Sequence, residues 1–259
     1  MAAVNSDKDA AGAPFPETAD IETASDDFAR RFAGPTGAWM LGIQERIARA
    51  MLAGMPGARI VDVGGGHGQL AVPLCRAGYA VTVAGSDDAC RGRIADVLQS
   101  GQCRFVRGNL IALPLPDRSF EAAISFRLLP HCEAWPALIR ELCRVAQNAV
   151  IVDYPTSQGI NALAPALFGA KKKFEGNTRT WRSFRHDEVR RAFEDNGFRV
   201  VRREGQFFLP MALHRMLRCR PLSAGLEAMC RGLGLTRRWG SPVIVKAERV
   251  ATQGGGERG

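Results

Sequence analysis

Short apolar runs alternate with amphipathic stretches through the middle of this 259-residue chain. Apolar runs of strand length occur at residues 59–63, 79–84, 103–106, 119–125 and 148–154. Between them, apolar residues recur at helical spacing over residues 68–77, 88–99 and 133–146. Further strand-like runs occur at residues 198–203 and in SPVIVKAERV, residues 241–250. Buried strands separated by helices are typical of a parallel sheet with right-handed crossovers, so the pattern predicts an α/β fold.

The segments outside this alternation have a different character. Residues 1–25 hold few large apolar side chains, so we expect them to be disordered. Residues 26–53 show helical spacing, and the run Gly-Pro-Thr-Gly divides them into a short and a long piece. Residues 206–238 indicate one or two amphipathic, basic helices, and residues 251–259 a flexible tail. We therefore expect a single folded domain over residues 26–250.

Glycines crowd the segment that follows the first strand. In RIVDVGGGHGQL, Asp62 precedes a loop that contains Gly64, Gly65, Gly66 and Gly68. A strand, a glycine loop and a helix in succession bring the backbone close to a ligand at the helix N-terminus. The dinucleotide fingerprint needs a glycine where Gln69 stands, which argues against a nicotinamide-dependent oxidoreductase. No Gly-Lys-Ser/Thr follows, so the loop is not a P-loop for ATP.

Three stretches in order resemble class I S-adenosylmethionine-dependent methyltransferases. DVGGGHG, from Asp62, resembles the DxGxGxG motif of this superfamily. GNLIALPLPDRSFEAAIS (108–125) is similar to the acidic loop and fourth strand of members that act on quinones and other small molecules. LCRVAQNAVIVDYP (142–155) is similar to their fifth strand and the helix before it. The resemblance covers residues 58–155 and points to the small-molecule branch, which is quinone- or lipid-directed and of methyltransferase type 11.

The resemblance implies a fold, a cofactor and a reaction. The fold would be Rossmann-like, with a seven-stranded, mostly parallel sheet, helices on both faces and an antiparallel last strand. The cofactor would be S-adenosyl-L-methionine. The reaction would be methyl transfer to a small, lipophilic acceptor, and the chemistry would depend mainly on positioning, because the cofactor carries the reactive methyl group.

The resemblance also implies cofactor contacts at the glycine loop. Asp62 would hold the loop and reach toward the methionine part of the cofactor, and His67 would contact the cofactor. Backbone groups of the loop would approach the cofactor at Gly64, Gly65, Gly66 and Gly68.

Contacts with the nucleoside are implied after the next strands. The family usually has an acid at the end of the second strand for the ribose hydroxyls, but this chain has Gly85 there. We assign the role to Ser86 and Asp87, with helix capping as the alternative for Asp87. Asn109 takes the place of an acid that faces the adenine amino group, since an amide oxygen accepts the same hydrogen bond. The remaining expected contacts are Leu110, which would flank the adenine, and Phe126.

Candidates for acceptor chemistry follow the fourth and fifth strands. In an open parallel sheet, the acceptor should lie beyond the carboxyl ends of the strands. His131 is the candidate general base, because histidine titrates near neutral pH, although a packing role explains it equally well. Asp153 and Tyr154 would face the acceptor, with capping and packing as their alternatives. We expect His186 and His214, which lie in basic helical regions, at the surface.

Two inserts are candidates for a lid over the acceptor. The first spans residues 155–185, and in it Trp181 and Phe184 would form pocket walls. The second spans residues 206–240 and mixes apolar with basic side chains. Such a mixture indicates a pocket wall, a helix pair packed on the sheet edge, or peripheral contact with an anionic membrane.

Charge leaves a second kind of acceptor open. Lys and Arg number 35 against 26 Asp and Glu, which gives a net charge of +9. The basic stretch 171–240 suggests an RNA methyltransferase as an alternative. However, the chain has no separate RNA-binding module and no (D/N)PPY-type motif, so nucleic acid is not the expected partner. A non-catalytic protein that binds S-adenosylmethionine is the remaining alternative, because Gly85 and Asn109 depart from the family pattern.

The remaining features set the expected environment. The seven cysteines are scattered and never form a CxxC pair, which argues against a disulfide framework and a zinc site. No cluster of carboxylates or histidines is evident, so we expect no metal. The first residues lack a basic end followed by an apolar core, so we expect a cytoplasmic protein without a secretory signal.

Overall fold

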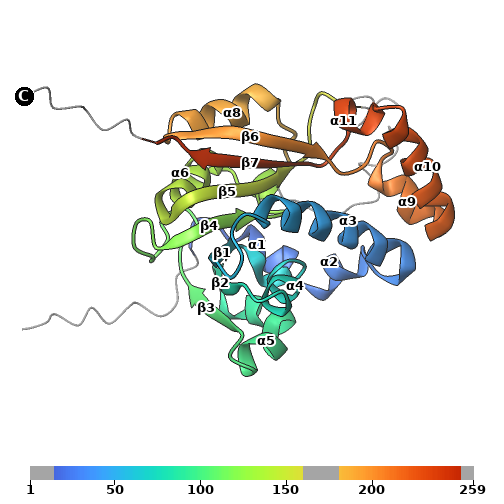
Figure 1. The fold of residues 1–259 in the computed structure, drawn as a ribbon. Helices are drawn as coiled ribbons and strands as arrows, with labels where there is room; N and C mark the ends of the chain where they lie inside the picture. Colours follow the sequence, from blue (N-terminus) through green and yellow to red (C-terminus); the bar gives the residue numbers. More distant parts are fainter. Residues whose placement is uncertain (1–14, 160–180, 252–259) are drawn as a thin grey trace, which may run out of the picture.

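The computed structural model describes residues 15–159 and 181–251. These residues form a seven-stranded sheet in the order β3-β2-β1-β4-β5-β7-β6 (Figure 1). The strands are β1 (Arg59–Val63), β2 (Ala80–Gly85), β3 (Cys103–Arg107), β4 (Phe120–Ser125), β5 (Ala146–Tyr154), β6 (Phe198–Gly205) and β7 (Val243–Arg249). Strand β7 runs antiparallel to both of its neighbours, and the remaining pairs are parallel. The predicted fold, including the antiparallel last strand, is confirmed.

Helices cover both faces of the sheet (Figure 1). One apolar core joins the sheet to α3 (Gly34–Leu52), α4 (Ala71–Arg76) and α5 (Ala95–Gln99). A second core, on the other face, joins it to α6 (Trp135–Val145) and α8 (His186–Glu194). Strand β1 is covered on both sides, since Ile60 belongs to the first core and Val61 and Val63 to the second. This double cover explains why β1 reads as a nearly continuous apolar run.

Several helix boundaries differ from expectation for identifiable reasons. The helix expected over residues 68–77 begins late, at Ala71, so that Pro73 lies in its first turn, where proline is tolerated. The short helix η1 (Gly65–His67) precedes it, and η2 (Asp88–Ile94) precedes α5. The downstream insert holds α9 (Met211–Leu217), α10 (Arg220–Gly232) and α11 (Leu235–Trp239) rather than one or two helices. Left-handed residues, Arg218 at φ 48° and Gly234 at φ 74°, separate these helices.

The expectation of disorder over residues 1–25 is wrong for the part that the structure describes. Residues from Phe15 onward are placed, and they include α1 (Ala19–Thr23), while α2 (Asp26–Arg30) follows directly. Asp20 is fully buried. The segment folds because its polar side chains find partners on distant parts of the chain, and apolar periodicity does not report such pairing. The folded domain therefore starts before residue 26.

Parts of other predictions fall outside the described residues. Residues 1–14, 160–180 and 252–259 are not described, so the flexible tail and most of the first insert stay predictions. The two described ends of that insert meet at a bridge between Thr156 and Phe184. In the described parts of the chain, we find no helix with the length and apolar character needed to cross a membrane.

Candidate active site

The glycine loop is shaped by close contacts within the protein. Gly64 and Gly68 adopt left-handed φ angles of 75° and 71°, which favour glycine. A Cβ on Gly65 would lie 2.2 Å from the carboxyl carbon of Asp62, and a Cβ on Gly66 would lie 2.5 Å from the carbonyl oxygen of Cys90. Side chains at both positions would therefore collide with carboxylate or backbone atoms. The loop therefore needs glycines in order to pack on Asp62 and η2. The sequence pattern had indicated only that glycines let a ligand approach the backbone.

Asp62 is a buried carboxylate that the protein leaves without hydrogen bonds. It is 0% exposed, and neither carboxylate oxygen has a hydrogen-bond partner among the described residues. Burial raises the pKa of Asp62 to about 8, and the nearby Cys75 thiol adds to the rise. An unpaired buried carboxyl group is costly, and a cation or hydrogen-bond donor from a ligand would relieve that cost. Asp62 therefore marks a place prepared for a positively charged or donor group.

His67 links the loop to the segment after β4. Its Nδ1 accepts a hydrogen bond from the Gln69 N–H at 3.0 Å, and its Nε2 lies 3.3 Å from the Phe126 carbonyl oxygen. Burial, together with the charge of Arg127, lowers the pKa of His67 to about 3. The ring is therefore neutral at physiological pH, with its proton on Nε2. It fixes the loop and is not a base for the acceptor.

The end of β2 carries a glycine against which an aromatic ring packs. A Cβ on Gly85 would lie 2.8 Å from ring atoms of Phe105, which fill the space. The neighbouring Ser86 is buried and donates both its backbone N–H and its hydroxyl to the carboxylate of Asp20. Asp87 caps η2 by accepting a hydrogen bond from the Ala89 N–H at 2.8 Å, which is the capping alternative of the sequence analysis. A ribose contact of Ser86 or Asp87 stays a prediction.

The end of β3 places the expected adenine contacts. Asn109 is half-buried, and its side-chain oxygen accepts a hydrogen bond from the Ile111 N–H at 3.1 Å. Leu110 is fully buried beside it. The amide oxygen of Asn109 thus closes a local turn, and a second lone pair is left for a ligand.

A buried arginine that the sequence analysis missed follows β4. Arg127 has a left-handed φ of 60°, and its guanidinium donates to the side-chain oxygens of Gln69 and Gln44, each at 2.6 Å. The guanidinium carbon also lies 4.2 Å from the centre of the Phe32 ring. Burial lowers the pKa of Arg127 to about 10, although the charge of Asp153 opposes the shift. The sequence signalled this residue only by placing an Arg two positions after the end of a buried strand.

The three candidate catalytic residues do not converge on one point. Asp153 is buried and accepts a hydrogen bond from the Arg127 backbone N–H at 2.6 Å. Tyr154 is the next residue of β5, so its side chain points to the other face, where its hydroxyl lies 2.9 Å from His186 Nδ1. His131 ends the short helix η3 (Leu129–His131) and is half-buried. Asp153 is thus the candidate that lies with the buried groups next to the glycine loop, and we call Asp62, the loop, Ser86, Arg127 and Asp153 the carboxyl-edge site.

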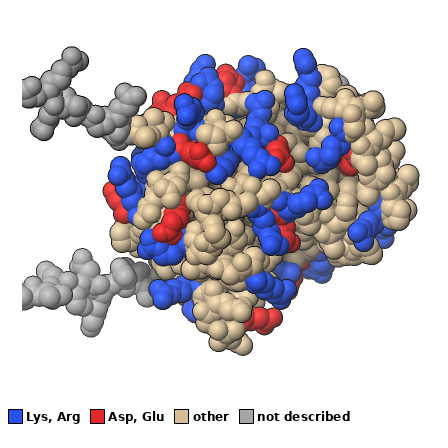
Figure 2. Space-filling model, viewed as in Figure 1, with Lys and Arg blue, Asp and Glu red and all other residues tan. Residues whose placement is uncertain are grey.

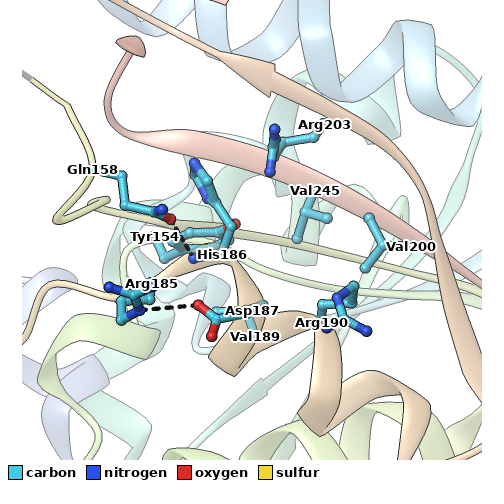
Figure 3. Close-up of a pocket in the computed structure, with 10 residues that line it drawn as sticks. All are labelled: Tyr154, Gln158, Arg185, His186, Asp187, Val189, Arg190, Val200, Arg203 and Val245. Carbon is cyan, nitrogen blue, oxygen red and sulfur yellow. Dashed lines mark hydrogen bonds and ion pairs between the residues drawn. The ribbon is translucent and has the colours of Figure 1, made fainter. Parts of the chain in front are cut away.

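A separate hollow lies beside α8, and we call it the α8 hollow (Figure 3). Its volume is about 530 Å³, and β5, β6, β7 and α8 contribute its walls. Burial and the charge of Arg203 lower the pKa of His186, which lines it, to about 4. Arg185 pairs with Asp187 at 3.1 Å and Arg190 pairs with Glu194 at 2.6 Å. No residue of the glycine loop lines this hollow.

Four further expectations about side chains have outcomes. His186 is half-buried in the α8 hollow, and His214 is fully buried and lies 3.0 Å from the Glu227 carboxylate, so neither is the surface residue we expected. Trp181 is 61% exposed, whereas Phe184 packs in the core against Trp135 and Tyr154. Phe184 is therefore a core residue and not a pocket wall, and the role of Trp181, which adjoins the undescribed residues 160–180, stays a prediction. Within the described ranges, no group of three or more His, Cys, Asp and Glu side chains is arranged to hold a metal ion.

Comparison with known proteins shows which family the chain resembles. Residues 61–152 match the family described as "Methyltransferase domain". The match covers β1 to β5 and therefore includes the glycine loop, Arg127 and most of β5. The fold, the loop and this match show that the chain is similar to class I methyltransferases, and two solved structures with this fold hold SAH or SAM.

Individual proteins that are similar to this chain include methyltransferases of known substrate. A magnesium-protoporphyrin O-methyltransferase from Synechocystis sp. is 28% identical over 57% of this chain and 66% of its own length, just under two thirds. A ubiquinone biosynthesis O-methyltransferase from Dinoroseobacter shibae is 27% identical over 64% of this chain and 70% of its own length. The crystal structure of the Synechocystis magnesium protoporphyrin IX methyltransferase with bound SAH superposes with a TM-score of 0.61. That superposition covers 87% of this chain and 94% of the other at 18% identity, and so supports the fold.

Proposed function

We propose that this protein transfers a methyl group from S-adenosylmethionine to a small-molecule acceptor bound at the carboxyl edge of the sheet. The observation that carries the proposal is Asp62, a fully buried carboxylate without a hydrogen-bond partner in the described chain, inside a methyltransferase motif. The cofactor carries an ammonium and a sulfonium group, and either cation would relieve the cost of that unpaired carboxyl group. The residues present therefore fit the cofactor.

We assign the remaining cofactor contacts to the glycine loop and to the residues that follow β3. The cofactor supplies an electrophilic methyl group, so the protein's task is to bind, orient and desolvate. Neutral His67 locks the glycine loop to Phe126, and the loop presents backbone groups rather than side chains. Asn109 and Leu110 lie at the end of β3, where we place the adenine. This arrangement holds the loop rigid before the ligand arrives.

On the acceptor side, we assign the main role to Asp153. Burial raises the pKa of its carboxyl group, although the nearby charge of Arg127 lowers it again in part. A carboxylate whose pKa lies closer to neutrality is a better base for an acceptor proton. The Arg127 backbone N–H fixes one oxygen of Asp153 at 2.6 Å, and the other oxygen would face the acceptor. His131 is the second candidate base, because it follows β4, the strand that pairs with β5.

We further propose that the acceptor is lipophilic and that the protein meets it at an anionic membrane surface. Helices α9, α10 and α11 lie together at one end of the molecule (Figure 1), and uncharged atoms dominate that end in Figure 2. Large apolar side chains are exposed there, namely Met216, Leu222, Met229, Leu233 and Trp239. The three helices hold five arginines and one acid, Glu227, which is buried. Exposed apolar groups flanked by cations suit an anionic lipid surface. The names of the porphyrin and quinone relatives agree with a lipophilic acceptor.

Calorimetry with four ligands tests the proposal. We expect S-adenosylmethionine and S-adenosylhomocysteine to bind and NADH not to bind. Silence toward both sulfur ligands would refute the cofactor, and strong RNA binding with a steep salt dependence would favour the RNA alternative. A radiolabelled methyl donor supplied with a lipid extract then tests the reaction. Binding without label transfer to any extract component would favour the non-catalytic alternative.

A further inference from the structure

A segment at the start of the described chain crosses the cofactor half of the carboxyl edge. We call residues 15–23 the N-terminal strap. At one end, the Arg107 guanidinium at the end of β3 lies 5.9 Å from the centre of the Phe15 ring. At the other, the carboxylate of Glu17 accepts a hydrogen bond from the Glu133 N–H, beyond β4, at 3.2 Å. Between these points, Asp20 reaches the loop after β2.

Asp20 is the fully buried acid of the strap, and its hydrogen-bond partners are neutral groups. The side chain is 0% exposed. Its carboxylate accepts hydrogen bonds from the Ser86 N–H at 2.7 Å, from the Ser86 hydroxyl and from the Cys90 thiol at 3.2 Å. No Lys or Arg among the described residues forms an ion pair with it. Buried carboxylates are usually paired with a cation, so this arrangement needs another reason.

The reason lies in the position of Gly85. In dinucleotide- and nucleoside-binding α/β folds, an acid near the carboxyl end of the second strand binds the ribose hydroxyls. The Phe105 ring occupies the space in which a side chain at Gly85 would have to lie, so an acid there would require this ring to move. The Asp20 carboxylate lies against the very next residue, Ser86.

We propose that Asp20 supplies the ribose-binding carboxylate of the cofactor site, delivered by the N-terminal strap instead of by β2. The proposal rests on the cofactor assignment and not on the identity of the acceptor. A carboxylate has about four acceptor positions, and the protein donors occupy three of them. The ribose diol would use the remaining position and replace the weak thiol donor of Cys90. The Ser86 N–H and hydroxyl would keep the carboxylate aimed at the ligand.

The strap geometry adds a consequence. Because Asp20 belongs to the strap, cofactor binding and strap docking would stabilise each other by the same free energy. We expect the amide hydrogens of α1 to exchange more slowly when S-adenosylhomocysteine is bound. The Asp20→Asn variant should lose most of that protection.

The test compares ligands and variants in one calorimetric cycle. S-adenosylhomocysteine and its 2′-deoxy and 3′-deoxy analogues are titrated into the full chain, the Asp20→Asn variant and the Asp27→Asn variant. Asp27 is the matched control, because it is a nearby acid that is 83% exposed and pairs only locally with Arg30. We expect D20N to bind S-adenosylhomocysteine about 10- to 100-fold more weakly, the range for a lost hydrogen bond to a charged group. We expect D27N to match the wild type.

The cycle separates a ribose contact from a merely structural role. If Asp20 holds a ribose hydroxyl, at least one deoxy analogue loses affinity for the wild type and loses little further affinity for D20N, since both changes remove the same interaction. Additive losses would show that Asp20 only shapes the loop, and would overturn the proposal. Should D20N not fold, the wild type alone decides, because equal affinity for all three ligands also overturns it. No binding of S-adenosylhomocysteine to the wild type would instead refute the cofactor assignment.

Discussion

The carboxyl-edge site and the α8 hollow place ionisable groups in opposite conditions. At the carboxyl edge, Asp62 and Asp20 are fully buried and have no cationic partner among the described residues. In the α8 hollow, Arg185 and Arg190 lie near solvent and each has a carboxylate partner. The hollow has a volume of about 530 Å³, whereas a Cβ at Gly65 or Gly66 of the carboxyl-edge site would collide with neighbouring atoms.

The comparison shows that a region with open volume is not necessarily the region whose charged groups lack partners and would gain from binding a ligand. Paired surface charges are already satisfied, and an exposed pair contributes about 0–1 kcal/mol. An unpaired buried carboxyl group leaves a cost of about 1–3 kcal/mol that a ligand relieves on binding. Burial disfavours the charged form of a group, so it raises the pKa of Asp62 to about 8 at the carboxyl edge and lowers the pKa of His186 to about 4 in the α8 hollow. We therefore locate the chemistry at the carboxyl edge, and four predictions test that choice.

The largest expected effect is on catalysis at Asp153. Asp153→Asn keeps an oxygen for the Arg127 N–H but removes the proposed base, so kcat should fall about 100-fold or more. The affinity for S-adenosylhomocysteine, measured by calorimetry, should stay unchanged. In the wild type, kcat should rise as the pH increases through the raised pKa of Asp153. In the variant, kcat should no longer depend on pH in this range. An unchanged kcat would move the base to another residue, with His131→Ala as the next variant.

The next effect is on the fold of the glycine loop. Gly66→Ala places a Cβ 2.5 Å from the Cys90 carbonyl oxygen, so we expect a loss of about 1–3 kcal/mol in unfolding free energy. Binding of S-adenosylhomocysteine should weaken as well. Gly92→Ala is the matched control in the adjoining η2, because a Cβ there meets nothing within 4 Å. Equal urea denaturation midpoints for the two variants would contradict the packing account of the loop.

Asp62 gives a prediction about pH. Its folded pKa of about 8 lies above the unfolded value of about 3.9, so between these values the folded state binds the extra proton. The contribution of Asp62 to stability is therefore complete below about pH 4, and it is lost as pH rises toward 8, by up to about 1.4 kcal/mol per pH unit. Asp62→Asn should remove this part of the slope. Urea unfolding at several pH values measures the difference between the two proteins, and parallel curves would show that Asp62 is already ionised in the fold.

The sequence predicted the sheet well, because apolar runs carry that information. The expected limits of β1, residues 59–63, match the structure, since the strand is buried on both faces and glycines end it. Asp62 and the loop were found for the same reason, as a fixed spacing after a clear strand. The expected antiparallel last strand is also present, as β7.

The misses at Asp20 and His214 share one physical cause, which is polar pairing between residues that are separated in the sequence. Asp20 and Ser86 lie 66 positions apart, and nothing in the local pattern of either reports the other. His214 has basic neighbours in sequence, yet it packs 5.4 Å from Trp39 and bonds to Glu227. The backbone of Arg127 adopts a left-handed conformation that its sequence does not signal. Burial through hydrogen bonds leaves no periodic trace, whereas burial through apolar surface does.

The smallest expected effect is in the α8 hollow. Tyr154→Phe removes the hydroxyl that lies 2.9 Å from His186 Nδ1 and keeps the ring against Phe184, so we expect a loss of about 1 kcal/mol in unfolding free energy. Because Tyr154 points away from Asp153, the affinity for S-adenosylhomocysteine and kcat should both stay at the wild-type level. Arg190→Ala is the control on the same wall, and its half-exposed pair with Glu194 should be worth about 0.5 kcal/mol or less. A large fall in kcat for Tyr154→Phe alone would mean that the acceptor enters the α8 hollow, and would reverse the assignment of the two regions.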